Sequence, residues 1–155
     1  MQRVCVVGPS DSGKTTLVEA LVDALAEAGP VATIKSIHHD IEPDTPGTDT
    51  HRHRTAGADT AVGLTPSHAF EITPGGKRAA ESERALLEAT LDRLEGEGYA
   101  IALVEGFHDA PYPKIVLGER EDLTPPVAVR DSLAEIDVDA LAAAIADDTL
   151  GEDED

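Results

Sequence analysis

The stretch Gly8-Pro9-Ser10-Asp11-Ser12-Gly13-Lys14-Thr15 constrains the fold of this chain more than any other. The short apolar run Val4-Cys5-Val6-Val7 precedes it, and a segment with helical periodicity follows. The spacing G-x-x-x-x-G-K-T between a strand and a helix is that of a phosphate-binding loop. Its glycines let the backbone come close to an anion, which backbone amides and the start of the helix then hold. We therefore expect a nucleotide phosphate site here.

The side chains of this loop have distinct expected roles. Lys14 can place a positive charge on the outer phosphates, and Thr15 can offer its hydroxyl to Mg²⁺. We expect Lys14 to act in catalysis by offsetting the charge that develops on a transferred phosphoryl group. The residues expected to contact the nucleotide are Gly8, Ser10, Asp11, Ser12, Gly13, Lys14, Thr15 and Thr16.

Alternating strands and helices are predicted along the rest of the chain. Apolar runs predict strands at 3–7, 31–34, 99–104, 113–117 and 127–129, and helical spacing predicts helices at about 14–28, 51–57, 79–95 and 138–146. The first strand–helix–strand unit predicts a right-handed crossover. The expected fold is α/β, a doubly wound, mostly parallel sheet of the P-loop NTPase type with helices on both faces.

Two further features complete the expected organisation. The runs 60–65 and 69–72 predict a hairpin, with one of its strands entering the main sheet. Residues 1–146 are expected to form a single P-loop nucleotide-binding domain, and residues 147–155 an acidic, disordered tail.

Polar residues follow two of the predicted strands. Lys35, His39 and Asp40 come after the strand 31–34, and Glu105 comes after the strand 99–104. The carboxyl ends of strands in open α/β sheets face the ligand crevice. We therefore expect Asp40 and Glu105, together with Thr15, to hold Mg²⁺, directly or through water. Asp40 is also a candidate to orient an attacking water.

Histidines and arginines gather between residues 38 and 54. His38, His39, His51 and His53 suggest a metal site, although no Cys accompanies them. Binding of phosphate or another anion explains a basic cluster in so acidic a chain better, and Arg54 is a candidate for it. The letters Asp44-Thr45-Pro46-Gly47 match a D-x-x-G motif, but no apolar strand precedes them. The loop that holds them is expected to be switch-like.

The charge of the chain excludes some classes of partner. Twelve basic and thirty-one acidic residues give a formal net charge of −19, which argues against nucleic-acid and anionic-membrane surfaces. No apolar window of about 18 residues predicts a membrane span, and a cytoplasmic protein is expected. The acids are spread over the chain, which suggests adaptation to a salty cytoplasm.

The run from Thr33 to Ala58 resembles the MobB family of molybdenum-cofactor biosynthesis. The resemblance is carried by Ile-Lys, His-His-Asp, Asp-x-Pro-Gly-x-Asp and Arg-x-Ala-Gly-Ala, by the phosphate loop, and by Val-Glu-Gly-Phe and Lys-Ile later in the chain. It covers residues 3 to about 118. The family's pattern falls on Lys35, His39, Asp40, Asp44, Gly47, Asp49, Arg54 and Gly57.

The resemblance implies a GTP-binding accessory or adaptor protein with weak GTPase activity, which assists the attachment of GMP to molybdopterin. It implies Mg²⁺ and GTP as ligands, a possible molybdopterin site, a homodimer, and a MobA-type guanylyltransferase as partner. Lys35, His39 and Arg54 are the candidates to contact an anion, a partner or the cofactor. The chain has no Asn, so the N-K-x-D motif that reads guanine in other GTPases is absent, and the guanine preference comes from the resemblance alone.

Two other functions stay open. A small-molecule kinase shares the loop but needs a closing lid with several basic residues, for which Lys77, Arg78 and Arg84 are the available cluster. A metal-delivery GTPase or a binding module would use the histidines. ATP-dependent phosphorylation of an acceptor would favour the first, and stoichiometric zinc or nickel binding would favour the second.

Overall fold

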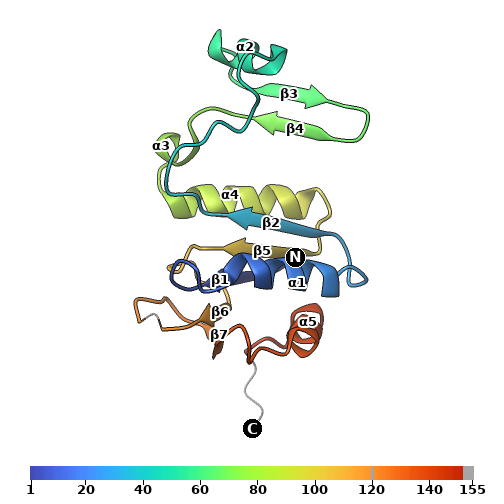
Figure 1. Ribbon diagram of the computed structural model, residues 1–155, viewed down its shortest axis with the longest axis vertical. Helices are drawn as coiled ribbons and strands as arrows, with labels where there is room; N and C mark the ends of the chain where they lie inside the picture. The colour runs from blue at the N-terminus through green and yellow to red at the C-terminus, as the bar shows by residue number, and fades with distance from the viewer. Residues whose placement is uncertain (120, 152–155) are drawn as a thin grey trace. The chain divides into compact units, whose positions relative to one another are not determined.

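A five-stranded parallel sheet forms the centre of the computed structural model, which describes residues 1–119 and 121–151 (Figure 1). The strand order is β2-β5-β1-β6-β7, and each neighbouring pair runs parallel. The bounds are β1 Gln2–Val7, β2 Val31–Lys35, β5 Ile101–Glu105, β6 Lys114–Leu117 and β7 Val127–Asp131. The predicted α/β class with a mostly parallel sheet is confirmed.

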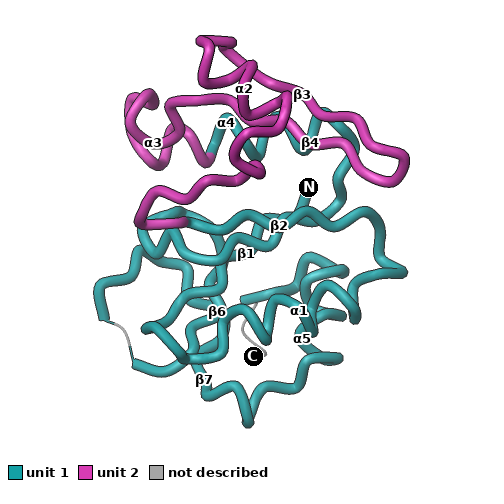
Figure 2. The backbone as a smooth tube through the Cα atoms, turned by 45° about the horizontal axis from the view of Figure 1, so that its top comes forward, with its two compact units in different colours: residues 1–36, 88–155 teal, residues 37–87 magenta. Residues whose placement is uncertain are grey.

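The chain divides into two compact units, which Figure 2 shows in different colours. Unit 1 comprises residues 1–36 and 88–155 and contains the parallel sheet. Unit 2 comprises residues 37–87. The single domain expected over residues 1–146 stays a prediction.

Helices α1 (Lys14–Ala24) and α5 (Val138–Ala146) cover one face of the sheet. Val4 and Val6 of β1 share a buried cluster with the apolar sides of both helices. The helical residues of that cluster are Leu17, Val18, Leu21, Leu141, Ala142 and Ile145. Burial of these aliphatic side chains is the main favourable term that joins helix to sheet.

Helix α1 ends earlier than predicted, at Ala24 instead of about residue 28. The N–H of Ala26 bonds the carbonyl of Asp23 and that of Ala28 bonds Leu25, so the chain tightens from four-residue to three-residue spacing. Gly29 then adopts φ 134° and turns the chain toward β2.

Helix α4 (Glu83–Gly96) covers the opposite face. Side chains alternate along a strand, so Arg3 points away from the face on which Val4 lies. Its guanidinium pairs with Asp92 at 3.1 Å and with Glu95 at 2.9 Å, and both belong to α4. Helices therefore lie on both faces, as predicted.

Unit 2 contains α2 (Asp49–Thr55), β3 (Ala61–Leu64), β4 (Ala69–Ile72) and α3 (Gly76–Ala79). Strands β3 and β4 pair antiparallel in a separate two-stranded sheet, which confirms the predicted hairpin. The expectation that one strand enters the main sheet is wrong. Strand β3 pairs with β4 in this separate sheet, and its larger side chains, Val62 and Leu64, are 54% and 81% exposed instead of buried between the faces of a central sheet.

The C-terminal elements follow the sequence pattern. Asp137 caps α5 by accepting the N–H of Ala140 at 3.0 Å, as its position predicts. In the segment expected to be a disordered tail, residues 147–151 are described, and Leu150 packs against the core. Residues 152–155 lie outside the described residues. Within the described part of the chain, no helix combines the length and the apolar character that crossing a bilayer requires.

Candidate functional site

The phosphate-binding loop leaves the carboxyl end of β1 and enters α1 at Lys14. Gly8 has φ 156° and Gly13 has φ 92°. A Cβ on Gly8 would lie 2.5 Å from the carbonyl oxygen of Leu117 and 2.8 Å from Oγ of Ser12. The loop therefore approaches β6 so closely that only glycine fits at this position.

The ammonium of Lys14 folds over the loop that precedes it. Its Nζ donates to the carbonyl oxygens of Gly8 at 2.9 Å and Pro9 at 2.6 Å. These bonds hold the positive charge beside the loop amides, where an anion would be bound. The expected role of Lys14 on outer phosphates is compatible with this position and stays a prediction.

One buried hydroxyl of the loop lacks a hydrogen-bond partner. Oγ of Ser12 is inaccessible to solvent, and in residues 1–119 and 121–151 only Nε of Arg54 shares this condition. Buried polar atoms in proteins are nearly always paired. A phosphate oxygen seated in the loop is the kind of group that this hydroxyl could pair with.

Glu105 lies beside the first turn of α1. It ends β5 on the same face as Ile101 and Leu103, which pack in the cluster that α1 covers, because alternate strand residues share a face. Only 7% of Glu105 is exposed. Its two carboxylate oxygens each accept from the hydroxyl of Thr15 at 3.2 Å. A hydroxyl and a buried carboxylate thus meet next to the loop.

Lys35 is the second partner of this carboxylate. The register of β2 and β5 places Lys35 directly opposite Glu105. Its Nζ lies 2.5 Å from Oε1 of Glu105, while 55% of the Lys35 side chain stays exposed. The structure therefore gives Lys35 a carboxylate as its neighbour, where the sequence suggested an anionic ligand or a partner.

Thr15 and Glu105 fit the requirements of Mg²⁺. This ion takes oxygen ligands, keeps several waters, and is bound by one or two protein oxygens together with substrate phosphates. The hydroxyl of Thr15 and the carboxylate of Glu105 are such ligands. Both lie where the phosphate loop opens, so a bound nucleotide would supply the remaining oxygens.

The chain beyond Glu105 is fixed by close backbone contacts. The N–H of Ser36 donates to the carbonyl of Glu105 at 2.9 Å, and the N–H of Gly106 donates to Val6 at 3.0 Å. Gly106 has φ 104°, and a Cβ there would lie 2.8 Å from Cβ of Ser36. These contacts hold the ends of β2 and β5 together, so the carboxylate has a rigid base.

Lys114 is a residue of this region that the sequence did not single out as functional. It is fully buried at the start of β6, and its Nζ donates to the carbonyls of Ala110 and, at 3.0 Å, Tyr112. It therefore ties the segment after β5 to the sheet. The signal in the sequence is a lysine that opens the apolar run Lys114-Ile115-Val116-Leu117.

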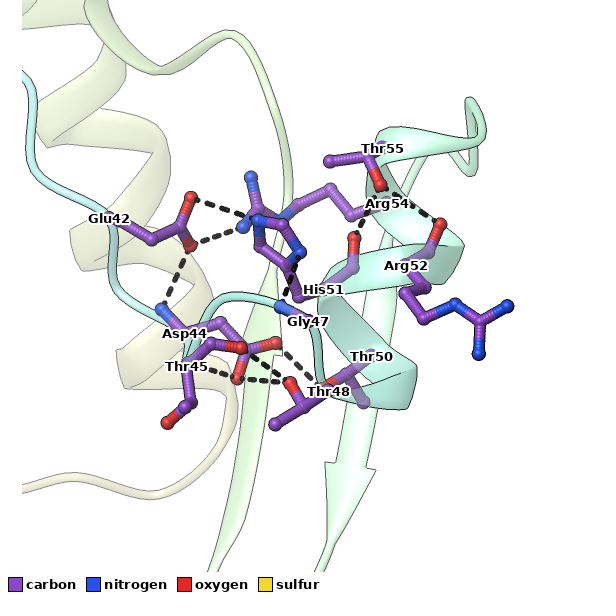
Figure 3. Close-up of polar contacts among 10 residues, drawn as sticks. All are labelled: Glu42, Asp44, Thr45, Gly47, Thr48, Thr50, His51, Arg52, Arg54 and Thr55. Atoms are coloured by element: carbon purple, nitrogen blue, oxygen red, sulfur yellow. Dashed lines mark hydrogen bonds and ion pairs between the residues drawn. The ribbon is translucent and has the colours of Figure 1, made fainter.

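In unit 2, the segment before α2 is organised by Asp44 (Figure 3). Its carboxylate accepts from the hydroxyl of Thr50 at 2.6 Å, the N–H of Thr45 at 2.8 Å and the hydroxyl of Thr48 at 3.4 Å. The bond from Thr50, more than any other cause, lowers the pKa of Asp44. The D-x-x-G letters therefore form a local turn that leads into a helix.

Glu42 holds the basic side chains of α2. It pairs with the guanidinium of Arg54 and lies 3.7 Å from Nε2 of His51, whose Nδ1 accepts the N–H of Gly47 at 3.2 Å (Figure 3). The carboxylate of Glu42 is thus the partner that the structure gives to Arg54. Nε of Arg54 remains buried and without a hydrogen bond in the described residues.

Asp40 also lies in unit 2, where its carboxylate pairs with Arg78 at 2.8 Å and both side chains are largely exposed. The structure thus brings together Lys14, Thr15, Lys35 and Glu105 in unit 1, and it places His39, Asp40 and Arg54 in unit 2. The expected roles of these three residues stay predictions. Across the described residues, no three His, Cys, Asp or Glu side chains are grouped so that they could hold a metal ion.

Comparison with known proteins identifies the family. The family model described as MobB, molybdopterin guanine dinucleotide synthesis protein B, matches residues 3–143. The chain belongs to the MobB family. The match covers the phosphate loop, the Lys35–Glu105 pair and α2, and it confirms the resemblance found in the sequence.

Relatives and solved structures agree with MobB membership. A molybdopterin-guanine dinucleotide biosynthesis adapter protein of Haemophilus influenzae is 34% identical over 140 residues, which make up 90% of this chain and 71% of that protein. An adapter-protein relative from Methanocaldococcus jannaschii is 34% identical over 126 residues, 79% of this chain, and the chain spans about half (49%) of its length. The crystal structure of Bacillus subtilis MobB matches with a TM-score of 0.66 at 23% identity, covering 92% of this chain and 97% of that one. The last match bears on the fold alone.

Proposed function

We propose that this chain is a GTP-binding adaptor in the biosynthesis of molybdopterin guanine dinucleotide, with weak GTPase activity. The observation that carries the proposal is the meeting of Thr15 and buried Glu105 beside the phosphate loop, with hydroxyl–carboxylate distances of 3.2 Å. Family membership supports the pathway, since relatives are named adapter proteins of this biosynthesis.

The nucleotide would bind through groups that the loop already presents. Backbone amides of residues 10–16 and the start of α1 favour the phosphates electrostatically. Lys14 would transfer its ammonium from two loop carbonyls to phosphate oxygens. Mg²⁺, when bound, would neutralise phosphate charge. Thr15 and Glu105 would hold and orient it on the protein side.

Hydrolysis by the isolated chain is expected to be slow. Catalysis of phosphoryl transfer needs a group that positions the attacking water and is strongly accelerated by an arginine finger. The chain's one Gln, Gln2, begins β1 and so lies at the opposite end of that strand from the phosphate loop. Arg54 is held by Glu42. These observations favour an adaptor whose nucleotide state matters more than its turnover.

The proposed partners are molybdopterin and a MobA-type guanylyltransferase, with the chain acting as a homodimer in the cytoplasm. Membership of the MobB family supports these proposals. His39 and Arg54 are the side chains that we propose for contact with an anionic cofactor or a partner.

A nucleotide-binding experiment tests the proposal. Affinities for GTP, GDP and ATP would be measured with Mg²⁺ in concentrated KCl, for the parent protein and for Lys14→Ala. We expect GDP and GTP to bind more tightly than ATP, and Lys14→Ala to lose at least tenfold in affinity. Lys77→Ala is the matched control, because it removes an ammonium that pairs with Glu83 at 3.1 Å.

Two results would contradict the proposal. Preference for ATP together with phosphorylation of an acceptor would favour a small-molecule kinase. Rapid GTP hydrolysis by the isolated protein would contradict the weak GTPase. A third function, metal delivery by the histidines, predicts stoichiometric zinc or nickel binding that is lost when His38, His39, His51 and His53 are replaced.

A further inference from the structure

We propose that Lys35 is a built-in counter-cation of the magnesium site, which neutralises Glu105 in the nucleotide-free protein and leaves it when Mg²⁺ binds with a nucleotide. The inference rests on the proposed function, because it assigns Mg²⁺ to Thr15 and Glu105. It makes Lys35 a positioning residue that sets how much Mg²⁺ the nucleotide complex requires.

The backbone fixes Lys35 and Glu105 as neighbours. They are register partners in adjacent parallel strands, so their side chains leave the sheet on the same face. The N–H of Ser36 donates to the carbonyl of Glu105 at 2.9 Å, which ties the two strand ends at this point. The register of the sheet therefore sets the two side chains next to each other.

The two partners differ in exposure. The Glu105 side chain is 9% exposed and stays beside Thr15, whereas that of Lys35 is 55% exposed. A buried carboxylate without a cation is costly, so Glu105 needs a positive charge in the absence of metal. Lys35 supplies that charge from the solvent side, and its flexible stem allows it to move away without any shift of the sheet.

Mg²⁺ and the ammonium compete for the same oxygen. Oε1 of Glu105 accepts from Lys35 at 2.5 Å and from Thr15 at 3.2 Å. A divalent cation on Thr15 and Glu105 would lie within a few ångströms of the ammonium, where like charges repel strongly in a partly buried site. Binding of the metal therefore displaces Lys35. Because the ion pair must be broken first, the apparent affinity for Mg²⁺ is weaker than it would be without Lys35.

A direct role of Lys35 on phosphate predicts the opposite sign. If the ammonium bound a phosphate oxygen, its removal would weaken nucleotide binding with and without metal. If it is a counter-cation, its removal lowers the Mg²⁺ requirement. The sign of one measured change thus separates the two roles.

The experiment titrates MgCl₂ into the full-length protein with GDP and measures the Mg²⁺ concentration that half-saturates nucleotide binding. We expect Lys35→Met to lower this concentration by about tenfold. This factor corresponds to the lower end of the stabilisation that a charged hydrogen bond provides, which is appropriate because the lysine is half exposed. Lys77→Met, which breaks a partly exposed ion pair with Glu83 in unit 2, should leave it unchanged. A higher Mg²⁺ requirement or an unchanged one would overturn the proposal.

A second readout does not depend on nucleotide. Without metal, the change Lys35→Met leaves Glu105 without a cation. The thermal midpoint of the Lys35→Met variant in EDTA should therefore lie below that of the Lys77→Met variant. In the background Glu105→Gln, the same Lys35→Met change should have little effect, because the charge it compensates is gone. An equal effect in both backgrounds overturns the inference. Failure of the parent protein to bind GDP overturns the proposed function, and the EDTA comparison then decides on Lys35 alone.

Discussion

Replacing Gly8 by Ala tests how tightly the phosphate loop is packed against the sheet. The new Cβ would lie 2.5 Å from the carbonyl oxygen of Leu117, a distance that real Cβ atoms essentially never show. Leu117 is fully buried in β6, and β6 pairs with β1 through Val7 and Val116, so the carbonyl has no room to withdraw. The loop itself must shift.

The expected cost has two parts. Overpacking of a tight contact costs about 1–3 kcal/mol. An L-residue at φ 156° adds strain of about 1–3 kcal/mol. We therefore expect Gly8→Ala to reduce the free energy of unfolding by about 4 kcal/mol. The displaced amides should also weaken GDP binding by more than tenfold.

Gly98 provides the control, because it also has positive φ, 93°, but no atom lies within 4 Å of the position of its Cβ. Gly98→Ala should therefore show backbone strain alone, about 1–2 kcal/mol, and unchanged GDP binding. Urea denaturation at constant KCl, followed by circular dichroism, measures both variants. If Gly8→Ala costs no more than Gly98→Ala, the packing of the loop against Leu117 is not what the structure indicates.

Three further predictions concern the remainder of the chain. Burial raises the pKa of the Cys5 thiol from about 9 to about 12, so the unfolded chain loses this proton at a lower pH than the folded protein does. The free energy of unfolding should therefore fall as the pH rises between these two values. Urea midpoints measured at successive pH values should show a shallower fall for Cys5→Ala. Asp137→Ala removes the 3.0 Å bond to the N–H of Ala140 and should cost about 1 kcal/mol, whereas Asp139→Ala in the same helix turn should cost less in the same urea assay. With a net charge of −19, the protein should have a higher thermal midpoint in molar KCl than in dilute buffer, and equal midpoints would refute adaptation to salt.

The elements of this fold could be predicted because their signals are local. Glycines, an aspartate cap and the spacing of apolar residues lie within the elements that they define. Thus Asp137 indicated the start of α5, and the apolar run before Glu105 indicated a strand that ends there. The end of α1 was predicted too late, because the apolar spacing continues to Ala28 after the hydrogen bonds have tightened.

The strand order could not be predicted, because pairing depends on contacts between distant segments. Nothing near β1 indicates that β5 and β6 flank it, with about a hundred residues of chain between partners such as Val6 and Glu105. The separation of β3 and β4 from the main sheet had no local signal either, because Ala61-Val62-Gly63-Leu64 is as apolar as a strand of the parallel sheet.

The site shows the same limit. Lys35 and Glu105 were each predicted as functional, but the register that makes them partners is a property of the folded sheet. Lys114 was predicted only as part of a strand and of the Lys-Ile segment, and its burial was not, because lysines usually lie at the surface. Here the carbonyls of Ala110 and Tyr112 satisfy its ammonium in the interior, and only the folded segment brings them there.

The claim on which the account depends is that residues 8–16 bind the phosphates of a nucleotide. The most direct test records backbone amide NMR resonances while GDP and Mg²⁺ are added in concentrated KCl. We predict saturable shifts at the amides of this loop, with the largest near Gly13 and Lys14, and at least tenfold more GDP needed to reach them in Lys14→Ala. Shifts confined to other parts of the chain, or an unchanged GDP requirement in Lys14→Ala, would contradict this claim.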